Sequence, residues 1–156
     1  MRQLIFFTAI VVTGMVLGAN VYNSVVDAPN WGAQIPGSLE TARRYFGARN
    51  PGTFYRIASP LGQAIGVLVL IAAWKFGGTT RTLAVAALGL GMLADAFTFA
   101  YFYPRNDVMF AQPVDINAMT QSWIGWSRMN HLRSLVVLAV LLCQLNLLWR
   151  VARTMN

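Results

Sequence analysis

The segment 122–134, SWIGWSRMNHLRS, gathers most of the side chains that could do chemistry in this chain. It holds the single histidine, His131, together with Asn130 and Arg133, and it leads into a long apolar run. An imidazole can accept a proton, and an amide and a guanidinium can stabilise a negatively charged oxygen. The segment is therefore either a catalytic site or the anchoring end of a membrane helix.

Helical geometry separates the polar residues of this segment into two groups. At about 100° per residue, Trp126, Asn130 and Arg133 fall on one stripe of a helix. His131 lies about 100° away from Asn130 and is off that stripe. We expect Trp126, Asn130 and Arg133 to turn inward, while Trp123 anchors the end of the helix at the membrane surface.

The composition indicates an integral membrane protein. Of the 156 residues, 56% are hydrophobic and 11% are charged, whereas a soluble domain has about a quarter charged residues. The apolar residues form four blocks, and about 20 such residues span a bilayer as a helix. We therefore predict an all-α, four-helix transmembrane bundle as a single domain, residues 1–156. Its helices are expected at about 4–26, 61–76, 82–103 and 122–151; the second could begin near Tyr55 and the fourth at Ser122 or Asn130.

The connections predict how the helices are arranged. The turn 75–81 is short, so the two helices that it joins must be antiparallel neighbours. Loops 27–60 and 104–121 are long and lie on the same side of an even-numbered bundle. The first should contain a short interfacial helix that Ser38 caps and that runs to Phe46.

The formal net charge of +7 raises the question of nucleic acid. The basic residues flank the apolar blocks and do not form a patch with interleaved aromatics, so we assign them to lipid phosphates and exclude a nucleic-acid partner. We expect a bacterial inner-membrane location with cytoplasmic termini, although the count of basic residues slightly favours the loop side. One cysteine, Cys143, excludes an intramolecular disulfide.

Polar residues from three helices are expected to meet at the end of the bundle that carries the long loops. Asp95 lies within an apolar block and must face the interior with a partner, for which Arg133, His131, Asn20 and Tyr22 are candidates. The candidate catalytic residues are Asp95, Asn130, His131 and Arg133, and the candidate substrate-binding residues are Asn20, Tyr22, Phe99, Phe102, Tyr103 and Trp126. The alternatives are a structural polar pair at Asp95 and an interfacial aromatic belt.

Cofactor-binding motifs are sparse in the sequence. A single histidine cannot supply a bis-histidine haem site, the only glutamate, Glu40, lies in a loop, and no nucleotide motif occurs. We expect no cofactor and no metal, with a single haem or metal held by His131 as the alternative.

Three features together resemble the anthrone-oxygenase-like family of small four-helix membrane proteins. They are the arginine-containing first loop, YFYPRN at 101–106, and W-x3-N-x2-R at 126–133. The resemblance implies oxidation of an anthrone to an anthraquinone by molecular oxygen without a cofactor. By this resemblance, the base would be His131 or Asp95, and Arg133 and Asn130 would stabilise the enolate oxygen. The aromatic substrate-binding site would be lined by Trp126, Phe99 and Phe102.

Two functions from different classes follow. The first is an oxygenase-like membrane enzyme that acts on a planar, lipid-soluble ketone or quinol. It predicts a roomy cavity ringed by Trp126, Asn130 and Arg133. The second is an accessory or assembly subunit of a larger membrane complex, in which these residues fill the space with one another. The expected partners are the bilayer, a lipophilic aromatic molecule, and other membrane proteins or further copies of the chain.

Overall fold

The protein is a bundle of long helices. The computed structural model describes residues 2–113 and 115–155, and within them there is no strand. Four segments are long and apolar enough to cross a membrane: Gln3–Gly32, Pro51–Phe76, Gly78–Met109 and Ile116–Thr154. This confirms the predicted fold class. The helices are α1 (Arg2–Tyr22), α2 (Ala28–Gly32), α3 (Gly37–Tyr45), α4 (Pro51–Ala73), α5 (Gly78–Phe97), α6 (Tyr103–Met109) and α7 (Ile116–Met155), with π-helical turns at Asn23–Asp27 and Thr98–Phe102 and a 3-10 turn at Trp74–Phe76.

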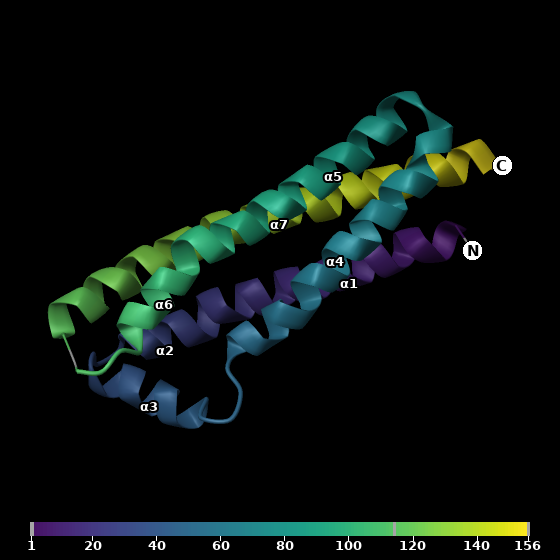
Figure 1. Ribbon diagram of the computed structural model, residues 1–156. Helices are drawn as coiled ribbons and strands as arrows, with labels where there is room; N and C mark the ends of the chain where they lie inside the picture. The colour runs from purple at the N-terminus through teal and green to yellow at the C-terminus, as the bar shows by residue number, and fades with distance from the viewer. Residues whose placement is uncertain (1, 114, 156) are drawn as a thin grey trace.

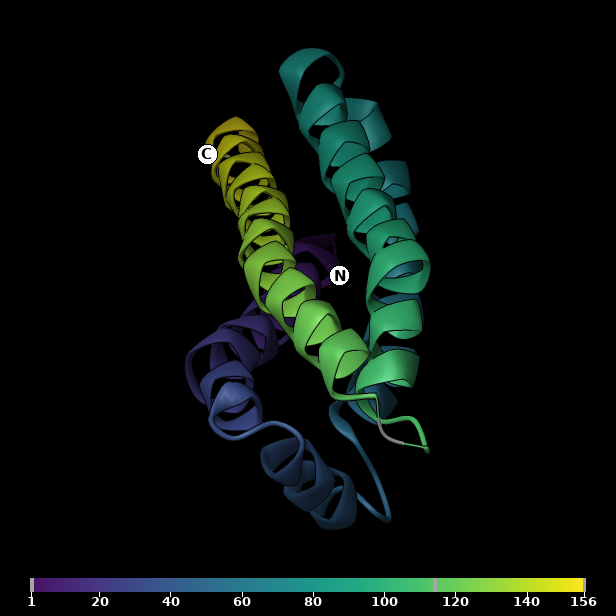
Figure 2. The same cartoon turned by 90° about the vertical axis from the view of Figure 1, so that its left-hand side faces the viewer.

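The long helices form a closed ring in which each packs against two others. α1 contacts α4 and α7, and α5 contacts the same two helices. Both termini and the α4–α5 turn lie at one end, which we call the terminal end, and α3 and the α6–α7 connection lie at the other, the loop end (Figure 1). Figure 2 views the bundle from the loop end, where α3, in dark blue, lies below the ends of the long helices. This arrangement of ends is the one predicted from the loop lengths.

Two of the long helices begin earlier than predicted. α4 starts at Pro51, not at 61 or Tyr55, and α7 starts at Ile116 instead of Ser122 or Asn130. Proline is favoured in the first helical turn because its φ angle suits the helix and its missing N–H is not needed there. The sequence NPG at 50–52, which resembles a turn, is therefore the start of a helix.

The short helix α3 is present, but Ser38 does not cap it. The helix begins at Gly37, one residue before Ser38. The Ser38 hydroxyl donates a hydrogen bond to the backbone carbonyl of Trp31 and accepts one from the backbone N–H of Gln34. Ser38 thus ties α3 to α2 through the intervening turn.

Glycine matters most at the α4–α5 turn, where Gly77 and Gly78 have φ angles of 63° and 45°. L-residues with side chains rarely adopt these angles, so the turn depends on both glycines. A Cβ at Gly66 would lie 3.0 Å from Leu88, so this residue permits close packing of α4 on α5. No described side chain lies within 4 Å of such a Cβ at Gly14 or Gly18.

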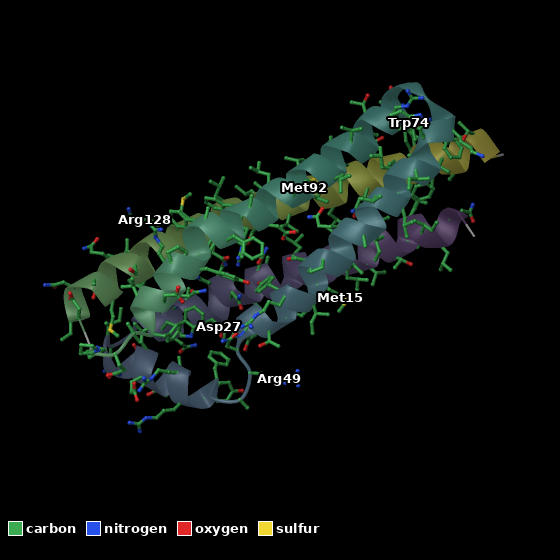
Figure 3. The ribbon with its side chains drawn as sticks, viewed as in Figure 1. Met15, Asp27, Arg49, Trp74, Met92 and Arg128 are labelled. Carbon is green, nitrogen blue, oxygen red and sulfur yellow. The ribbon has the colours of Figure 1, made fainter. Side chains whose placement is uncertain are left out.

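The buried apolar residues form two clusters, one at each end of the bundle. The terminal-end cluster includes Phe6, Val69 and Leu147, and the loop-end cluster includes Phe102 and Trp126. Lipid-facing side chains surround both. Met15 and Met92, for example, are labelled in Figure 3, project away from the bundle and are exposed.

Candidate functional site

Arg133 is a buried cation near the loop end of the bundle. Its side chain is 4% exposed, and its guanidinium carbon lies 4.2 Å from the ring centre of Phe102 and 5.0 Å from that of Tyr55. Within residues 2–113 and 115–155, no carboxylate forms an ion pair with it. An arginine at the centre of a membrane helix costs about 3 kcal/mol on insertion scales, and such residues usually have a counter-charge or a function.

Asn130 holds Arg133 in place one helical turn away. Its side-chain carbonyl accepts a hydrogen bond from Arg133 Nη2. Its Nδ2 donates to the backbone carbonyl of Asn20, 3.0 Å away, and to Ser24 Oγ, 2.7 Å away. Asn130 is fully buried, and its amide therefore fixes both the Arg133 side chain and the contact of α7 with α1.

Tyr55 extends this network to α4. Its hydroxyl donates a 2.7 Å hydrogen bond to Asn20 Oδ1 and accepts one of 3.2 Å from Asn23 Nδ2. On the other side of the bundle, Arg133 Nη1 lies 3.4 Å from Thr98 Oγ1. Three membrane-spanning segments thus contact the Arg133 guanidinium, and the first segment joins the network through its hydrogen bonds to Tyr55 and Asn130.

Asp95 has a different partner from any of those predicted. Its Oδ2 accepts a 2.8 Å hydrogen bond from Gln63 Nε2 on α4. The predicted partners Arg133, His131, Asn20 and Tyr22 do not bond to it. The apolar neighbours of Gln63 in the sequence do not indicate this role, although an amide is well suited to satisfy a carboxylate inside a membrane.

A cavity of about 270 Å³ opens beside Arg133 at the loop end. Aromatic residues make up much of its wall, and Arg43, Arg56 and Asp107 also line it. Such an apolar, aromatic lining with a few polar groups is typical of sites for small molecules. The aromatic residues are Trp31, Phe46, Tyr55, Phe102, Tyr103, Phe110 and Trp126. We call this space the loop-end cavity.

A second space, the central cavity, runs between the four long helices and measures about 80 Å³. Asn20, Asp95 and Gln144 line it together with small and apolar residues. Tyr55, Thr98 and Arg133 line both cavities and form the partition between them. Asp95 is therefore on the far side of Arg133 from the loop-end cavity.

The predicted site residues divide into four groups. Trp126, Phe102, Tyr103 and Arg133 line the loop-end cavity, while Asn20 and Asp95 line the central one. Asn130 lines neither cavity and instead supports Arg133. His131, Phe99 and Tyr22 are exposed on the outside of the bundle and line neither cavity. In Figure 3, Arg128 likewise lies on the outer side of α7.

A local change of helix type explains the outward position of Phe99. In a regular α-helix, the spacing of Asp95, Thr98, Phe99 and Phe102 would place all four on one face. Residues Thr98–Phe102 form a π-helical turn, in which each residue advances by a smaller angle than in an α-helix. Phe102 is buried and Phe99 is 60% exposed. Tyr22 directly precedes the corresponding turn at Asn23–Asp27.

Residues that sequence reasoning missed are Tyr55, Gln63 and Ser24. Tyr55 and Gln63 lie on α4, whose beginning was expected to be a loop or an interfacial segment. Their spacing of eight residues places both on one helix face. This spacing is the feature of the sequence that could have indicated that both face the interior of the bundle. Ser24 lies shortly before Asp27, near the predicted end of the first span. Polar residues are common at the membrane surface, so the sequence does not single out Ser24.

The described residues contain no group of three or more histidine, cysteine, aspartate or glutamate side chains placed to hold a metal ion. His131, which would be the ligand in the alternative with a single haem or metal, is exposed on the outside of α7. Searches against protein-family models, curated protein sequences and solved structures find no match to this chain.

Proposed function

We propose that this chain is a membrane enzyme of the anthrone-oxygenase type, which binds a planar, lipid-soluble ketone or quinol in the loop-end cavity. The observation that carries the proposal is the buried guanidinium of Arg133, which lines this aromatic cavity and has no carboxylate partner among residues 2–113 and 115–155. A cation in such a place is positioned to stabilise an oxygen that becomes negative during a reaction.

The proposed reaction converts the ring methylene that lies across the central ring from an aryl ketone into a second carbonyl. A base removes one proton from the methylene carbon, and the negative charge moves to the ketone oxygen, where Arg133 stabilises it. The carbanion then adds to molecular oxygen, and the resulting hydroperoxide loses water. One oxygen atom of O₂ remains in the product and the other leaves as water, so the substrate supplies all four electrons.

The base in this proposal is Asp107. Asp107 lines the loop-end cavity with Arg133, whereas Asp95 is bonded to Gln63 in the central cavity and His131 is exposed on the outside of α7. A base must lie within hydrogen-bonding reach of the proton that it removes. This assignment replaces Asp95 and His131, which the sequence alone favours.

The test is oxygen consumption by the purified protein in lipid nanodiscs supplied with anthrone. Because removing one oxyanion donor commonly lowers turnover about 100-fold, Arg133→Gln should lose activity on this scale. The matched control is Arg128→Gln, on the same helix but exposed to the outside, which should keep wild-type turnover. Anthrone oxidation that is no faster with the protein than in empty nanodiscs contradicts the proposal.

The accessory-subunit function has one observation in its favour. The N–H donors and the oxygen acceptor of the Asn130 amide all bond to other residues of the bundle. This part of the polar network therefore holds helices together without any ligand. Native mass spectrometry of gently extracted membranes separates the two functions. A fixed complex with other membrane proteins, and no turnover of aromatic ketones, supports the accessory subunit.

A further inference from the structure

Two buried N–H groups beside the loop-end cavity have no hydrogen-bond partner among the described residues. They are Nε1 of Trp126 and Nε of Arg133, and their side chains are 3% and 4% exposed. Both residues line the cavity. A buried donor without an acceptor is costly, and native proteins usually satisfy it with a ligand or an ordered water. A ligand in this cavity must therefore supply hydrogen-bond acceptors for these two N–H groups.

The two donors lie on one face of α7 on either side of Phe102. They are seven residues apart, a separation of two helical turns or about 10 Å along the axis. The Trp126 ring centre is 5.6 Å from that of Phe102, and the Arg133 guanidinium carbon is 4.2 Å from the same centre. A planar ligand beside Phe102 would thus have one donor near each of its two ends.

Both groups donate and neither can accept, because an indole and a guanidinium have no acceptor. A ring with a single carbonyl satisfies only one of them. A ring with two carbonyls in the para relation places one acceptor at each end. With a hydrogen bond of about 3 Å at each end, the length of this arrangement is close to the rise along α7 between the two donor residues.

The remaining walls suit a flat ring. Trp31 packs at 5.1 Å from the Trp126 ring centre and at 5.8 Å from that of Phe110, in both cases edge to face. Rigid aromatic side chains of this kind provide contact area with little loss of conformational freedom.

We propose that the loop-end cavity selects para-dicarbonyl rings, that is quinones, by holding one carbonyl at Arg133 and the other at Trp126. Trp126 is then a specificity-determining residue that distinguishes a quinone from a ketone with one carbonyl. This inference rests on the proposed function for the place of the ligand. In the proposed reaction the para-dicarbonyl ring is the product, so the site is inferred to hold the product more tightly than the substrate with one carbonyl.

The test is equilibrium dialysis of 1,4-naphthoquinone and 1-tetralone against the protein in nanodiscs, with empty nanodiscs as the blank. The wild-type protein should bind the quinone at least about fivefold more tightly, as expected for one additional hydrogen bond. Trp126→Phe keeps an aromatic ring but removes the N–H, and it should abolish this preference. Trp149→Phe, on the same helix at the terminal end, is the matched control and should keep it.

Each alternative result has a distinct meaning. Binding of both ligands with equal affinity to the wild-type protein, or a preference that persists in Trp126→Phe, overturns this inference and leaves the proposed function standing. Binding of neither ligand contradicts the proposed function itself, and the inference fails with it.

A second measurement does not depend on the folding of a variant. The chain has five tryptophans, and their indole N–H signals can be followed in the wild-type protein by ¹⁵N NMR. One signal should move downfield when naphthoquinone is added and should stay in place with tetralone. The absence of any selective shift with naphthoquinone overturns the role of Trp126.

Discussion

Replacement of Asn130 by alanine tests the polar network that holds Arg133. The substitution removes two hydrogen bonds from Asn130 Nδ2 to α1 and its adjoining π-helical turn, and it also removes the acceptor of Arg133 Nη2. Hydrogen bonds between membrane helices contribute on average about 0.6 kcal/mol each. A bond from a charged donor contributes about 2 kcal/mol. We therefore expect Asn130→Ala to lower the free energy of unfolding by about 3 kcal/mol.

The assay is reversible unfolding in mixed micelles, followed by helix content. The matched control is Asn146→Ala, because Asn146 lies on the same helix and also accepts a hydrogen bond from an arginine, Arg150, at 2.9 Å. Asn146 is exposed, and removal of such an exposed contact should change stability by less than about 0.5 kcal/mol. Equal losses in the two variants would refute the claim that the buried network stabilises the bundle.

Two further predictions concern the loop end. A Cβ at Gly32 would overlap the indole ring of Trp123, so Gly32→Ala should lower the unfolding free energy by about 1–3 kcal/mol. Gly14→Ala should leave it unchanged, because the space around Gly14 is open. Equal melting curves for the two variants argue against this packing. Hydrogen bonds from Arg43 and Arg44 hold the pKa of Glu40 below its usual range, so the stabilising pairs on α3 should persist above the usual glutamate pKa and weaken as pH falls through the lowered value. A ¹³C NMR titration of the Glu40 carboxyl checks this, and an unchanged pKa in the Arg43→Ala variant contradicts it.

Helical periodicity was enough to predict the stripe on α7. Trp126, Asn130 and Arg133 are buried, and His131 between them is exposed, as an uninterrupted α-helix requires. The fold followed from the same kind of information, because four apolar blocks and one short turn leave few ways to arrange the helices. The ends of the helices were predicted less well, since Pro51 begins a helix in a segment that resembles a turn.

The site could be predicted only in part, because it depends on two features that a sequence pattern does not display. The π-helical turn at Thr98–Phe102 changes which residues face inward, so Phe99 is exposed while Phe102 is buried. Several polar residues could be the partner of Asp95 by sequence alone. Only the packing of α4 on α5 places Gln63 next to it.

The proposed function requires that the loop-end cavity holds a planar, lipid-soluble ring beside Arg133. Photolabelling with benzophenone in nanodiscs, with peptide mass spectrometry to locate the label, tests it most directly. Label should accumulate on side chains lining this cavity, such as Tyr103 and Phe110, and excess naphthoquinone should prevent this labelling. Label found only on lipid-facing side chains such as Met15 and Met92, and unaffected by naphthoquinone, would contradict it.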